Sequence, residues 1–84
     1  MKEKFAILHD TEKHGQILIT KEYDLKDKFY KITYQFELEG VMPVFRLNIK
    51  SRKKANKVFK ELENKETAIS EIDKIIIAIQ RVTG

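Results

Sequence analysis

The sequence predicts an α+β fold, in which a four-stranded antiparallel β-meander is followed by two C-terminal helices packed on one sheet face. Up to about residue 50 the apolar residues recur at every second position, as in strands with one buried face. Beyond Ser51 the apolar period lengthens to about 3.6 residues, as in helices. With 84 residues, the chain is expected to form a single domain, residues 1–84, around one small core.

Two strands are expected in the first 23 residues. Residues 4–9 form a short apolar run that ends in the turn-prone segment 10–15. Residues 16–23 form the next strand, in which Ile17, Ile19 and Tyr23 share one face. The polar segment that follows this strand is expected to be a loop leading into the third one.

The third and fourth strands show the same alternation. Residues 29–40 hold one buried set, namely Tyr30, Ile32, Tyr34, Phe36 and Leu38. A tight turn is expected at Glu39–Gly40, and the strand within residues 41–50 should bury Phe45, Leu47 and Ile49. Pro43 cannot donate a backbone hydrogen bond, so this strand belongs at a sheet edge or a bulge. Short connections favour strands that pair in sequence order.

Ser51 is the expected N-cap of the first helix, and Asn64 is expected to end it. The apolar stripe of this helix consists of Ala55, Val58, Phe59 and Leu62. A second helix, from about residue 66 to 82, has a wider stripe made of Ala68, Ile69, Ile72, Ile75, Ile76, Ile79 and Val82. If residues 64 and 65 are helical instead, residues 52–82 form one long bent helix.

The segment KSRKKANKVFK, residues 50–60, carries six cationic side chains and no acidic one. On a helix, Lys53, Lys57 and Lys60 lie opposite the apolar stripe, so a solvated helix face is the simplest interpretation. Cations in the first turn oppose the helix dipole by up to about 1 kcal/mol, which a bound anion would relieve. The candidate residues for binding nucleic acid or an acidic partner are Arg46, Lys50, Arg52, Lys53, Lys54, Lys57 and Lys60.

These residues predict a small non-catalytic binding protein that contacts the nucleic acid backbone without sequence preference, because reading bases needs mainly Arg, Asn or Gln. Four antiparallel strands followed by helices resemble, in element order, the whirly-type single-strand DNA binders. All but one of the strand aromatics fall in the buried phase, which disfavours base stacking, and Phe29 is the exception. The alternative is a protein-interaction module, an inhibitor or adaptor of the kind encoded by mobile elements, whose lysines meet an acidic protein surface.

Catalytic and cofactor-binding signatures are not found in the sequence. It has no cysteine, its serines Ser51 and Ser70 have no histidine near in sequence, and its three glycines form no phosphate-binding loop. An enzyme or a cofactor is therefore not expected. A hairpin loop with two imidazoles and two carboxylates suggests a weak metal site, but a solvated loop is favoured. These side chains are His9, Asp10, Glu12 and His14.

Self-association is suggested by Ile77, an apolar residue on the polar side of the second helix. It suggests that the C-terminal helix lies in a homodimer interface or is covered by the first helix. The Pro43 strand is a second possible dimer contact, and a lone exposed isoleucine is the ordinary alternative. The longest apolar run, residues 75–79, is too short to span a bilayer, and the N-terminus lacks a signal-peptide core. The sequence therefore predicts a cytoplasmic protein that makes no membrane contact.

Overall fold

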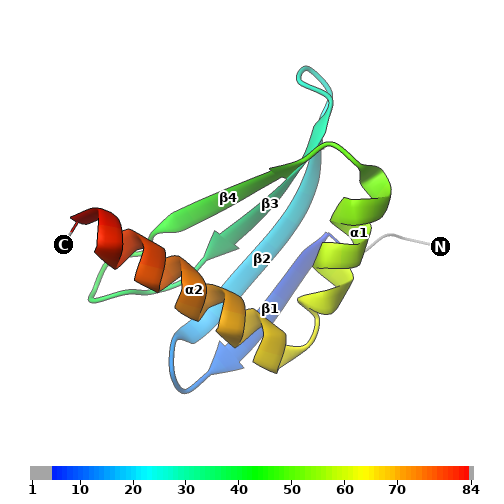
Figure 1. Cartoon of the computed structure of the whole chain (residues 1–84). Coiled ribbons are helices and arrows are strands. Elements are labelled where there is room, and N and C mark those ends of the chain that lie inside the picture. The colour runs from blue at the N-terminus through cyan, green and yellow to red at the C-terminus, as the bar shows by residue number, and fades with distance from the viewer. Residues whose placement is uncertain (1–4, 84) are drawn as a thin grey trace.

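The computed structural model describes residues 5–83, which form a four-stranded antiparallel sheet in the order β1-β2-β3-β4 and two helices (Figure 1). The strands are β1 Ala6–Thr11, β2 Gly15–Asp24, β3 Phe29–Gln35 and β4 Val44–Ile49. The helices are α1 Arg52–Glu61 and α2 Lys65–Thr83. The predicted fold class and strand order are confirmed. Lys4, where the first strand was expected to begin, lies outside the described residues.

The connections follow the predicted turn chemistry. Gly15 has φ 67° where the chain turns into β2. Glu39 and Gly40 have φ 50° and 80°, and Leu38 and Val41 on either side of them exchange both backbone hydrogen bonds. The tight turn at Glu39–Gly40 is therefore confirmed. The flanking strands are shorter than predicted, because regular pairing stops at Gln35 and resumes at Val44, just beyond Pro43.

The two helices are separate, so the single bent helix is excluded. Leu62 ends α1 as its C-cap, and Asn64 is the residue just before α2. The Asn64 side-chain Oδ1 accepts a hydrogen bond from the Thr67 backbone at 3.1 Å, which caps the start of α2. Asn64 was expected to stop the first helix, and its side chain in fact starts the second.

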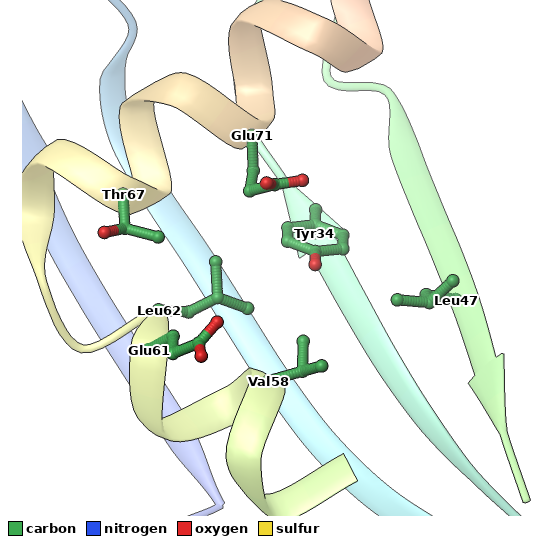
Figure 2. Close-up of a pocket in the computed structure, with 7 residues that line it drawn as sticks. All are labelled: Tyr34, Leu47, Val58, Glu61, Leu62, Thr67 and Glu71. Carbon is green, nitrogen blue, oxygen red and sulfur yellow. The ribbon is translucent and has the colours of Figure 1, made fainter. Parts of the chain in front are cut away.

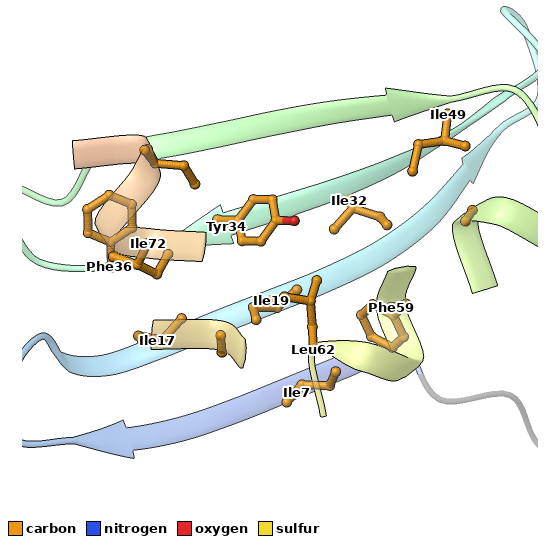
Figure 3. Close-up of a cluster of buried hydrophobic side chains, with 13 residues drawn as sticks. Ile7, Ile17, Ile19, Ile32, Tyr34, Phe36, Ile49, Phe59, Leu62 and Ile72 are labelled. Atoms are coloured by element: carbon orange, nitrogen blue, oxygen red, sulfur yellow. The ribbon is translucent and has the colours of Figure 1, made fainter. Parts of the chain in front are cut away.

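One face of the sheet, termed the inner face, carries the hydrophobic core, and both helices pack on it (Figure 3). The other face is termed the open face. Six large side chains are less than 2% exposed and come from β2, β3, α2, the C-cap of α1 and the residue after β3. They are Ile17, Ile19, Ile32, Phe36, Leu62 and Ile72. The predicted alternation of β2 and β3 and the stripe of α1 thus pack together as expected.

The two helices form a V over the inner face (Figure 1). Helix α1 leaves the end of β4 and runs towards β1, where the carbonyl of Leu62 accepts a hydrogen bond from His9. Helix α2 starts near β1 and returns to the beginning of β4, where Val82 lines a hollow with Phe45. The apex of the V therefore lies over β1, and its mouth lies over β4.

Four predictions of burial were wrong because of this arrangement. Phe45 and Leu47 are 40% and 37% exposed, so only Ile49 of the inner-face residues of β4 is buried. Val82, expected in the apolar stripe of α2, is 87% exposed. Tyr23 lies beyond the part of β2 that α1 covers and is 45% exposed. Apolar alternation identifies the face of a strand, but the paths of the helices decide which part of that face is covered.

Candidate functional site

The basic residues of α1 are held outward by the burial of its opposite side. Ala55 and Phe59 are buried against the sheet, which leaves Lys53, Lys57 and Lys60 exposed as predicted. These three lysines are termed the α1 basic face. The Ser51 Oγ accepts a hydrogen bond from the Lys54 backbone at 3.2 Å, so the helix start is capped as expected. Within residues 5–83, none of the three lysines forms an ion pair.

Three further cations lie where β4 passes into α1. Arg52 and Lys54 are exposed in the first turn of the helix, which has no acidic residue. Lys50 and Lys54 line a hollow of about 470 Å³ together with Leu47, Ile49 and Val58. Positive charge therefore extends from the α1 basic face to the end of β4.

Arg46 is separated from the other six predicted residues. It pairs in register with Thr33 of β3 and alternates with Phe45 and Leu47, whose side chains lie on the inner face. Arg46 therefore lies on the open face of the sheet, on the opposite side from the helices. The exposed phase predicted for Arg46 is confirmed, but the open face and the α1 basic face lie on opposite sides of the sheet, so Arg46 does not extend the patch as expected.

A buried lysine under α1 was not predicted. Lys21 is 7% exposed, and its Nζ donates a hydrogen bond to the Asn56 Oδ1 at 2.6 Å. The same Nζ lies 5.1 Å from the centroid of the Phe59 ring, in cation–π geometry. The signal was present in the sequence, because Lys21 shares the inner phase of β2 with Ile17 and Ile19.

Between the two helices the inner face of β4 is open and forms an apolar surface, termed the β4 groove. Leu47 lies at its centre and lines adjoining hollows of about 220, 260 and 470 Å³. Figure 2 shows the first of these hollows, with Tyr34 of β3, Leu47 of β4 and Val58 of α1 around it. A hollow of about 270 Å³ continues the groove along α2, lined by Phe45, Ile75, Ala78, Ile79 and Val82.

Tyr34 forms part of the floor of the β4 groove and is in ring contact with Phe45, with centroids 6.1 Å apart. Burial, and to a smaller extent the nearby Glu71 carboxylate, raise the pKa of Tyr34 to about 12. The phenol therefore stays neutral near neutral pH, and the groove keeps an uncharged floor.

The two histidines were expected in one hairpin loop with Asp10 and Glu12, and this was wrong for His9 and Asp10, which lie in β1. His9 lies within β1 on the inner face, and its Nε2 donates a hydrogen bond to the Leu62 carbonyl at 2.7 Å. His14 stays in the turn, where its Nε2 lies 2.8 Å from Asp73 of α2. Among residues 5–83, no three His, Asp or Glu side chains gather into a set that could hold a metal ion.

Asp73 ties the β1–β2 turn to α2. Its carboxylate accepts hydrogen bonds from the Lys13 Nζ at 3.0 Å and lies 2.8 Å from His14. The hydrogen bonds from Lys13 and then from His14 hold the pKa of Asp73 below its usual range. Together with the His9 contact, these bonds close the apex of the V.

Two tyrosines are in tilted ring contact on the inner face near the start of α1. Tyr23 and Tyr30 have ring centroids 4.8 Å apart, and Tyr30 pairs in register with Ile49, two residues before Ser51. Phe29, which was expected to be the free aromatic, is half-buried, with the Lys31 Nζ 5.9 Å from its ring centroid. The exposed aromatics at this end of the sheet are therefore Tyr23 and Phe5, whose carbonyl accepts a hydrogen bond from the Lys21 backbone.

Ile77 is 52% exposed. The residues three and four positions away on α2, its neighbours on the helix surface, are polar or charged: Asp73, Lys74, Gln80 and Arg81. The more extensive exposed apolar surface runs along β4 and includes Val41, Met42, Val44, Phe45 and Leu47.

Comparisons with protein-family models, with curated proteins and with solved structures found no match to this chain. Neither helix of the described residues has the length and apolar character that a bilayer span requires.

Proposed function

We propose that this protein is a non-catalytic binding protein whose α1 basic face contacts the backbone of nucleic acid. The observation that carries the proposal is the concentration of charge. Residues 51–60 hold five cationic side chains and no acid, whereas the rest of the chain holds twelve cationic and thirteen acidic ones. All of the net charge of +4 therefore comes from α1, whose three outward lysines form no ion pair within residues 5–83. Such a face attracts phosphates through charge alone.

The residues on α1 favour backbone contact over base reading. Lysine binds phosphate as a point charge, whereas Arg, Asn and Gln make the paired hydrogen bonds that identify a base. Asn56 is the only amide on α1, and its Oδ1 already accepts the hydrogen bond from Lys21. The exposed ring of Tyr23 supplies aromatic surface at the same end of the sheet, which would favour single strands. Binding should therefore depend weakly on sequence.

The test is fluorescence anisotropy with labelled single-stranded and duplex DNA of arbitrary sequence over a range of salt concentrations. The test variant replaces the three lysines of the α1 basic face together by Gln. The matched control makes the same change at three exposed cationic residues of α2, Lys65, Lys74 and Arg81. We expect the wild-type affinity to fall steeply with salt, and loss of three phosphate contacts to lower the slope of log K against log salt by roughly 2 to 3. The control variant should behave like the wild type.

Two results would overturn the proposal. One is no binding by the folded wild-type protein at low salt. The other is equal loss of affinity in both triple variants, which would reflect overall charge and not the α1 basic face. In either case an acidic protein surface becomes the partner to test, as for an inhibitor or adaptor, and a pull-down with and without nuclease would identify it.

A further inference from the structure

The outer edge of β4 has no neighbouring strand among residues 5–83, since the sheet order ends at β4. Its six residues carry one charge, Arg46, and its inner side opens into the β4 groove. Long edges of this kind are usually protected by charges, bulges or covering segments, because their free backbone groups pair readily with other strands. We propose that a second copy of this chain covers this edge, pairing β4 with β4 about a two-fold axis to make one eight-stranded sheet.

The residues of β4 match a second copy in one register. With Leu47 facing Leu47 of the second copy, Phe45 faces Ile49 on the inner side and Arg46 faces Asn48 on the outer side. Every inner pair is then apolar, and no like charges stand directly opposite. Pro43 falls beyond the end of this ladder, where its missing N–H costs no hydrogen bond.

The neighbouring registers are each unfavourable. Centring the pair on Arg46 places two arginines directly opposite, and centring it on Asn48 places Arg46 opposite Lys50 twice. Centring it on Phe45 brings Pro43 into the ladder and leaves Ile49 without a partner. Only the Leu47 register combines apolar inner pairs with compatible outer pairs. This self-complementarity is what a two-fold interface requires and is the reason to choose a second copy over an unrelated strand.

In this register the hollow at one end of the β4 groove of one copy lies next to the hollow at the other end of the groove of the second copy. The hollow beside the C-terminal part of α2 is lined by Phe45 and Val82, and the hollow beside the start of α1 is lined by Ile49 and Val58. Because Phe45 of one copy lies next to Ile49 of the other, each α2 end lies beside the other copy's α1. The exposed Val82 then gains apolar neighbours that it lacks in one copy alone.

The dimer carries two α1 basic faces on the same side of one sheet, since a two-fold axis perpendicular to the sheet keeps both inner faces together. Each copy carries a net charge of +4, so the copies repel each other at low salt. Screening weakens this repulsion, and the contact between the copies is mainly apolar. Dimerisation should therefore strengthen as salt rises, whereas binding to nucleic acid weakens. The two proposals can thus fail separately.

Asn48 offers the sharpest test because it is exposed and lies directly opposite Arg46 of the second copy across the proposed interface. Within one copy it pairs in register with Lys31, so the stability of each variant is also measured at a concentration where the chain is monomeric. Asn48→Arg places like charges opposite each other twice per dimer and should weaken dimerisation about tenfold. Asn48→Asp places opposite charges there and should strengthen it by a similar factor of about ten. The measurement is sedimentation velocity of the full chain from low to high micromolar concentration, with circular dichroism to check the fold.

Gln80→Arg adds the same charge on the side of α2 away from the groove, and Ile77→Asp removes the exposed isoleucine. Neither should change the dimer. A wild-type monomer at the highest concentration overturns the proposal, and so does a dimer on which both Asn48 variants have no effect. A dimer that Ile77→Asp dissociates also overturns it, because the contact would then lie on α2.

Discussion

The two edges of the sheet lie under the same pair of helices, yet one is closed and the other is open. Over β1 the helices meet, the His9 side chain bonds to the Leu62 carbonyl, and Asp73 of α2 holds the β1–β2 turn. Over β4 the helices have separated, and Phe45 and Leu47 remain 40% and 37% exposed. The two edges differ in coverage, although both strands alternate in the same way.

This difference shows that the position of the break between the helices, at Asn64, determines which strands of the sheet the helices cover. The chain must reverse between α1 and α2, and it does so over β1. There His9 bonds to the C-cap residue of α1, and side chains of the β1–β2 turn bond to α2. Two helices that diverge from one joint cannot cover the strand farthest from it. The apolar residues Phe45 and Leu47 of β4 therefore remain exposed in a single copy of the chain.

The largest change in the free energy of unfolding is expected from a Leu→Ala substitution at the apex of the V, compared with the same substitution at its mouth. Leu62→Ala empties a site that is 1% exposed and should lower the free energy of unfolding by about 2–5 kcal/mol. Leu47→Ala removes a side chain that is 37% exposed and should cost roughly 1 kcal/mol. Urea unfolding followed by circular dichroism, at low protein concentration to limit association, measures both.

The pair of variants tests the comparison directly. Equal losses of stability would mean that the groove is closed in solution and that β4 is as well covered as β1. A larger loss at Leu47 at high protein concentration only would place this residue in the interface with a second copy.

Much of the fold could be predicted because it depends on local patterns. The period of two in the strands, the Glu39–Gly40 turn and the Ser51 cap are each determined by a few neighbouring residues. Coverage of β4 could not be predicted in this way, because it depends on the angle at which the helices cross the sheet. That angle is set by packing between residues far apart in the sequence.

The residues of the candidate site likewise differ in how well local patterns predicted their positions. Helical phase correctly exposed Lys53, Lys57 and Lys60, because burial of Ala55 and Phe59 leaves them one direction to face. Arg46 lies on the exposed face of its strand as expected, but it does not join the α1 basic face, because the helices cover the opposite face of the sheet. Lys21 was overlooked because lysine is rarely buried, although its position in β2 matched its apolar neighbours.

A smaller effect is expected at the joint between β1 and α1. His9→Leu keeps the apolar volume but removes the donor to the Leu62 carbonyl, which is then left without this partner. The expected loss of unfolding free energy is about 1–3 kcal/mol. His9→Gln returns an N–H group and should recover part of the loss. If His9→Leu were as stable as the wild type, the hydrogen bond would not hold the apex closed.

The smallest effect is expected at Asp73, whose ion pairs join the β1–β2 turn to α2. Its pKa lies below 3.8 in the folded protein, so its contribution to stability is present above the unfolded pKa and is lost as pH falls through the folded one. Because the carboxylate is partly exposed, Asp73→Asn should cost less than about 1 kcal/mol near neutral pH. The difference in unfolding free energy from the wild type should shrink towards zero below pH 3.8 and also decrease with salt.

The control is Asp27→Asn, which changes an exposed carboxylate in the β2–β3 loop. A difference that persists unchanged in strong acid would show that Asp73 stabilises the apex through its shape and hydrogen bonds and not through its charge.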